Sequence, residues 1–176
     1  WEACCEDLFG EIDALFAHHF PTIEHLDFDV RDRPIFDRLV SQRANVNDYR
    51  IVPKLLSKWL HQATGQPVII LIDEYDTPIH AAWDQGYYPQ IIDFMRAFLS
   101  SACKDNSHLF KAMITGILRV AKESIFSGMN NLGVYSIDDQ TMHTSFGFTE
   151  DEVKTLLGVR ELSDHLEDVR KWYNGY

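Results

Sequence analysis

Apolar residues recur at helical spacing in four segments of the first two thirds of the chain. They predict helices over about residues 2–18, from Pro34 to Val40, over about 52–63 and over about 91–102. Pro21 is expected to end the first helix, and Gly65 with Pro67 the third, because these residues interrupt helical backbone. The first part of the chain is therefore expected to be mainly helical.

Four shorter segments have the composition of β-strands. VIILI, residues 68–72, is continuously apolar and β-branched, as is typical of a strand covered on both faces. A second buried strand is predicted for LFKAMITG, residues 109–116. A short strand is predicted for TIEHLDFDV, residues 22–30, and an edge strand for GVYSID, residues 133–138. Strands that alternate with helices predict a three-layer α/β domain with a mainly parallel sheet.

Two more helices are expected near the end of the chain. Thr149 and Glu152 have the spacing of a capping box, in which each side chain bonds to the backbone amide of the other residue. Apolar positions from Leu162 to Tyr173 predict the last helix.

Polar residues stand where the predicted strands end. They are Asp27, the pair Asp73 and Glu74, and Thr115 with Gly116. In open α/β sheets, ligands bind beyond the carboxyl ends of the strands. These residues are therefore expected at one functional edge of the sheet.

Asp73 and Glu74 suggest phosphoryl-transfer chemistry. A carboxylate at a strand tip can hold Mg²⁺, which prefers oxygen ligands, and a second carboxylate can polarise an attacking water. Four apolar residues followed by Asp-Glu are typical of a Walker B motif with a catalytic glutamate. The alternative is a solvated turn in which Asp76 or Thr77 caps a helix that starts at Pro78.

The segment after the second buried strand carries two further candidates. Thr115 would stand beside the attacking water and the γ-phosphate, and Arg119 has a guanidinium that can bind phosphate oxygens in a bidentate manner. Without a neighbouring Walker B strand, Thr115 would be read as a simple strand end and Arg119 as a solvated side chain.

The chain resembles the AAA-ATPase-like family of P-loop NTPases in ILIDEYDTPI, TGILRVAKESIFSGMNNL, FGFTEDEV and KWYNGY, in this order. The resemblance implies an ATP- and Mg²⁺-dependent hydrolase, with Asp73 as the metal-associated acid and Glu74 as the catalytic acid that activates water. It also implies Thr115 at the sensor position and Arg119 as a catalytic arginine, and it leaves Asp76, Lys122 and Asn130 without a role. Members are often fused to a C-terminal nuclease-like domain of the PD-(D/E)XK type, which would be a partner outside this chain.

One element of that family is missing from the sequence. A P-loop needs G-x-x-x-x-G-K-[ST], and none of the nine glycines is followed by lysine. The resemblance therefore implies a partial ATPase domain over residues 1–176 that lacks its first strand and phosphate loop. Its parts would be a leading helix over 1–20, the Walker B and sensor strands over 21–148, and a helical part over 149–176. Alone it is expected to be inactive.

Composition narrows the other possibilities. A net charge of −11 disfavours nucleic acid as a direct partner, and the longest apolar run is too short to cross a membrane. Three cysteines and eight histidines form no zinc motif, and the odd number of cysteines is typical of a reducing cytoplasm. Two other functions stay open, a metal-dependent phosphoesterase and a degenerate ATPase fold that acts as a protein-interaction module. An oligomer is possible.

Overall fold

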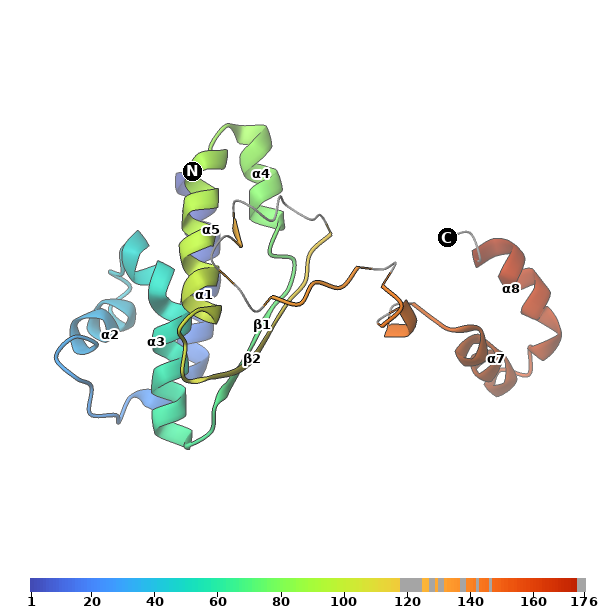
Figure 1. Cartoon of the computed structure of the whole chain (residues 1–176), viewed down its shortest axis with the longest axis horizontal. Helices are drawn as coiled ribbons and strands as arrows, with labels where there is room; N and C mark the ends of the chain where they lie inside the picture. Colours follow the sequence, from blue (N-terminus) through green and yellow to red (C-terminus); the bar gives the residue numbers. More distant parts are fainter. Residues whose placement is uncertain are drawn as a thin grey trace. The chain divides into compact units, whose positions relative to one another are not determined.

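The computed structural model describes residues 1–117, 125–126, 129, 132–136, 139–141, 143–145 and 147–173. They belong to two compact units, Trp1–Asn130 and Asn131–Tyr176 (Figure 1). The described helices of the first unit are α1 (Glu2–Ile23), α2 (Arg33–Val40), α3 (Val46–Thr64), α4 (Thr77–Gln85) and α5 (Tyr88–Cys103). Its described strands are β1 (Val68–Ile72) and β2 (Leu109–Ile114), both at the positions predicted from the sequence.

The ends of α3 follow from local chemistry. Asn45 accepts hydrogen bonds from the backbone amides of Asn47 and Asp48, and the Asp48 side chain bonds back to the Asn45 amide as a capping box. At the other end Gly65 has a φ of 70°, the left-handed conformation that commonly ends a helix. The prediction that Gly65 ends this helix is confirmed.

Two predictions around residue 21 are wrong. Pro21 lies inside α1, which continues to Ile23, and residues 22–30 contain no strand. Proline removes only its own amide donor, whereas the Glu24 amide still bonds to the Phe20 carbonyl at 2.9 Å. Ile23 is fully buried, so tertiary packing stabilises this last turn.

Strands β1 and β2 pair in parallel, with Ile70 opposite Ala112 and Ile72 opposite Ile114. Helices α3 and α5 pack on each other, α3 against β1 and α5 against β2, and α1 packs on α3 (Figure 1). The core between these elements contains Trp59, Phe94 and Leu99, all fully buried. The expected α/β organisation with a parallel sheet is therefore present, as a sheet of two strands within the described residues.

The sheet is covered on one face in the part of the chain that the structure describes. Ile69, Leu71 and Met113 are 58%, 73% and 58% exposed, whereas Ile70, Ile72, Ala112 and Ile114 are partly buried. We call Ile69, Leu71 and Met113 the bare face; Phe110 lies at the irregularity in the strand register. Within the described residues β1 is therefore covered on one face, and the expected cover on both faces is not present there.

The second unit contains α7 (Glu150–Val159), a 3₁₀ turn at Ser163–His165 and α8 (Leu166–Tyr173), with another short 3₁₀ turn at His143–Ser145. The capping box of Thr149 and Glu152 is confirmed. Arg170 of α8 pairs with Glu150 of α7 at 2.5 Å. The predicted edge strand is not formed by residues 133–136, and Ile137 and Asp138 lie outside the described residues.

None of the helices in the described ranges combines the length and the apolar character that a membrane crossing requires.

Candidate active site at the strand ends

The ends of β1 and β2 are joined by a short ladder of hydrogen bonds. The Thr115 amide donates to the Ile72 carbonyl at 2.9 Å, and the Tyr75 amide donates to the Thr115 carbonyl at 3.0 Å. The Thr115 hydroxyl also donates to Oδ1 of Asp73. Thr115 and Asp73, predicted from separate motifs, are therefore in direct contact.

Glu74 has an unusual backbone conformation within this ladder. Its φ is 50°, in the left-handed region that glutamate rarely adopts. Its amide lies 3.0 Å from Oδ1 of Asp73 and 3.4 Å from the Thr115 hydroxyl, and its Oε2 accepts a hydrogen bond from Thr77 at 3.4 Å. Strained residues of this kind cluster at functional sites. The side chains of Asp73 and Glu74 are both exposed to solvent.

Asp76 is oriented differently from the two preceding acids. It is only 1% exposed, and its Oδ2 accepts a hydrogen bond from the Ile117 amide at 3.0 Å. It occupies the N-cap position of α4 but makes no side-chain capping bond there. The alternative in which Asp76 caps this helix is therefore wrong, and the three carboxylates of the motif do not converge.

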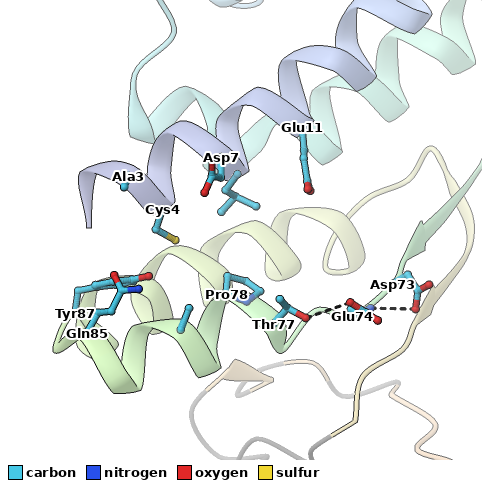
Figure 2. A pocket seen from close by; sticks show the side chains of 12 residues that line it. Ala3, Cys4, Asp7, Glu11, Asp73, Glu74, Thr77, Pro78, Gln85 and Tyr87 are labelled. Atoms are coloured by element: carbon cyan, nitrogen blue, oxygen red, sulfur yellow. Dashed lines mark hydrogen bonds between the residues drawn. The ribbon is translucent and has the colours of Figure 1, made fainter.

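A pocket of about 360 Å³ opens beside Glu74. Figure 2 shows Cys4, Asp7 and Glu11 of α1 on one wall, with Glu74, Thr77 and Pro78 opposite them. The sequence reasoning missed this wall, although the spacing of Asp7 and Glu11 places them one turn apart on one side of a helix. Four carboxylates line the pocket, so it repels a bare phosphate group.

Cys5 and Cys103 are not activated nucleophiles. Burial raises the pKa of the Cys5 thiol, and it does the same for Cys103. A raised pKa lowers the fraction of reactive thiolate at neutral pH.

The oxygen donors at the strand ends fit Mg²⁺ in one particular mode. Mg²⁺ is commonly held by one or two carboxylates, several waters and the phosphates of a substrate. Asp73 and Thr115 offer a carboxylate and a hydroxyl side by side. Across the described ranges, no three His, Cys, Asp or Glu side chains gather as a self-sufficient metal site. The site therefore suits Mg²⁺ bound together with a phosphate ligand.

The remaining predicted residue, Arg119, lies outside the described residues, as do Lys122 and Asn130. The described chain reaches Ile117, two residues before Arg119, where Asp76 holds the backbone.

Comparison with known proteins identifies the family. The family model described as AAA-ATPase_like, Predicted AAA-ATPase, matches residues 27–126, which is more than half of the chain and includes both strands and the acidic motif. The chain belongs to this AAA-ATPase-like family. The resemblance inferred from the motifs is thus confirmed.

A relative from Azotobacter chroococcum mcd 1, named "Uncharacterized protein in vnfD 5'region", is 34% identical over 125 residues. The match covers 69% of this AAA-ATPase-like chain but 23% of the relative, so the chain spans about a quarter of that protein's length. No solved structure matches the chain.

Proposed function

We propose that this chain supplies the Walker B and sensor half of an ATP-hydrolysing P-loop enzyme. The observation that carries the proposal is the contact of Thr115 with Asp73, next to the strained Glu74, at the ends of two parallel strands. This arrangement occurs in a chain whose family is described as predicted AAA-ATPase.

Each residue has a distinct task in the proposal. Asp73 would hold Mg²⁺, directly or through water, and the Thr115 hydroxyl orients its carboxylate. The ion would supply positive charge against the negative charge of the phosphates. Glu74 polarises the attacking water as a general base, and its backbone hydrogen bonds fix the start of its side chain. Arg119 binds charge on the transferred phosphate.

The phosphate loop comes, in this proposal, from polypeptide outside the 176 residues. Two observations support this. The chain contains no G-x-x-x-x-G-K-[ST], and the bare face leaves three large apolar side chains more than half exposed on a parallel sheet. Parallel sheets are almost always covered on both faces. A further strand and helix of the same protein would complete a three-layer P-loop core, and this chain alone would not hydrolyse ATP.

The decisive experiment measures ATP hydrolysis by a longer protein that contains this chain and a phosphate loop. Glu74→Gln keeps the shape of the side chain but removes the base, so kcat should fall roughly 100- to 10,000-fold. Glu11→Gln is the matched control, because Glu11 lines the same pocket from α1 and should leave kcat nearly unchanged. Equal rates for wild type and Glu74→Gln would remove Glu74 from catalysis. Glu74-dependent hydrolysis by the 176-residue chain would overturn the proposal that this chain carries only half of the active site.

A protein-interaction module is the second candidate, and the bare face is the observation that favours it. The two functions differ in nucleotide binding by the longer protein. If it is an ATPase, ATP with Mg²⁺ should raise its melting temperature, because a ligand that binds only the folded state stabilises it. If it is an interaction module, its melting temperature should not change. A phosphoesterase is not favoured, because Asp76 faces the Ile117 amide and Asp29 bonds to Lys58.

A further inference from the structure

Asp76 is a buried carboxylate that accepts a hydrogen bond from a distant part of the chain. Moving a carboxylate from water into the protein interior costs free energy unless hydrogen bonds compensate for the lost hydration. The Ile117 amide supplies one such bond at 3.0 Å, across 41 positions in the sequence. His80, one turn along α4, approaches the same oxygen at 3.4 Å.

Ile117 has no comparable anchor in its side chain, which is 87% exposed. Its backbone lies two residues beyond Thr115, whose amide and carbonyl make the last bonds of the strand ladder. Packing therefore does not hold Ile117 in place, whereas the charge-assisted hydrogen bond from its amide to Asp76 does.

Gly116 shows how closely the two segments approach. A Cβ atom at this position would lie 2.7 Å from Oδ1 of Asp76 and 2.6 Å from the Tyr75 ring. No side chain fits there, so the strand end lies directly against the turn that carries Asp73 and Glu74. Thr115, Gly116 and Ile117 thus contact residues 72–76 one after another.

We propose that Asp76 is a positioning residue that clamps the segment after β2 to the turn after β1. The clamp holds Thr115 against Asp73 and fixes the backbone at Ile117. The effect of the clamp on ATP hydrolysis rests on the proposed function, whereas the clamp itself does not.

Amide hydrogen exchange of the 176-residue chain tests the clamp without any nucleotide. Asp76→Ala should lower protection of the Ile117 amide roughly 10- to 100-fold relative to the α5 amides, because hydrogen bonds to charged groups are the strong ones. Asp76→Asn retains an oxygen acceptor and should lose several-fold less. If the alanine variant does not fold, the asparagine variant provides the test. Unchanged relative protection of Ile117 in both variants would overturn the clamp.

Asp32→Ala is the matched control. Asp32 is also a buried carboxylate, but it accepts hydrogen bonds from Trp59 at 2.8 Å and from Lys58 at 2.8 Å. Its removal should lower protection throughout the first unit without selecting Ile117. A selective loss at Ile117 in this control would show that the probe reports general destabilisation, and the clamp would be rejected.

Steady-state hydrolysis by the longer protein tests the positioning role. Asp76→Ala should lower kcat roughly 10- to 100-fold with little change in KM for ATP with Mg²⁺, as expected from a misplaced catalytic group. Asp76→Asn should recover most of the rate. Unchanged kcat together with lost Ile117 protection would reject the positioning role. A wild-type protein without hydrolysis would refute the proposed function, and the exchange result would still decide the clamp.

Discussion

The hydroxyl of Thr115 donates a hydrogen bond to the carboxylate of Asp73, across 42 positions of sequence and between the ends of two parallel strands. The same carboxylate oxygen lies 3.0 Å from the Glu74 amide. One oxygen thus links the sensor strand to the acidic turn.

The left-handed backbone of Glu74 should cost stability. Glycine has no penalty at positive φ, so Glu74→Gly should stabilise the chain by about 0.5–1 kcal/mol, net of the flexibility that glycine adds to the unfolded state. The measurement is denaturant unfolding. In the longer protein the same variant should abolish ATP hydrolysis.

Gln42→Gly is the control for Glu74→Gly, which is expected to gain stability and to lose activity. Gln42 has a φ of 54°, close to the 50° of Glu74, and its side chain has nearly the same size. A similar gain in stability with unchanged hydrolysis is expected. A loss of stability in Glu74→Gly would show that its side-chain contacts outweigh the backbone strain.

Gly116 should not tolerate even alanine. The added Cβ would clash with the Tyr75 ring and the Asp76 carboxylate, so Gly116→Ala should destabilise the chain by about 1–3 kcal/mol in denaturant unfolding. Gly10→Ala provides the opposite expectation, because Gly10 lies within α1 with open space around its Cβ position. Alanine there should stabilise by up to about 1 kcal/mol. Equal effects of the two substitutions would contradict the close approach at Gly116.

The bare face should become energetically important only when it is covered. In the 176-residue chain, Leu71→Ala should change the free energy of unfolding by less than about 0.5 kcal/mol, because Leu71 is 73% exposed. In the longer protein the same substitution should cost about 2–4 kcal/mol, the range for leucine in a packed core.

Ile70→Ala is the comparison on the other face of β1. Ile70 is partly buried against the described helices, so its substitution should destabilise both proteins to a similar extent. A small effect of Leu71→Ala in both proteins would mean that no segment covers the bare face.

Acid should weaken the contact between Asp29 and α3. The hydrogen bond from Lys58, at 2.7 Å, is the largest cause that lowers the pKa of Asp29 to about 2, and the amides of Asp32 and Arg31 lower it further. A carboxyl group whose pKa is lower in the folded state stabilises the fold above its ordinary pKa of 3.8. This contribution is lost as the pH falls from about 4 to about 2.

Urea unfolding of wild type and Asp29→Asn between pH 5 and pH 2 measures this contribution, with pH values chosen around about 3.8 and about 2. The asparagine variant should be the less stable protein at pH 5, and the difference should shrink toward pH 2. Lys58→Met removes the main cause of the pKa shift and should flatten the same part of the profile. A constant difference across the range would contradict the linkage.

Much of the local structure was determined by the sequence. The apolar run VIILI and the segment that follows Asn106 form strands where they were predicted, and Gly65 and the Thr149–Glu152 pair set helix ends by their own backbone chemistry. The four motifs, from ILIDEYDTPI to KWYNGY, together indicated the family. The spacing of apolar residues, the capping residues and the motifs can all be read along the chain, so they need no knowledge of contacts in the folded structure.

The tertiary structure decided the relations between distant residues. It placed Ile23 in the core and so extended α1 past Pro21, where the local rule predicted an end. Among the described residues it left one face of the sheet bare, and the Asp76 side chain bonds to the Ile117 amide and does not cap its helix. Each outcome depends on which surfaces meet after folding, and a buried carboxylate bonds to whichever amide packing brings to it. Asp76 and Ile117, separated by 41 positions, meet only in the folded chain.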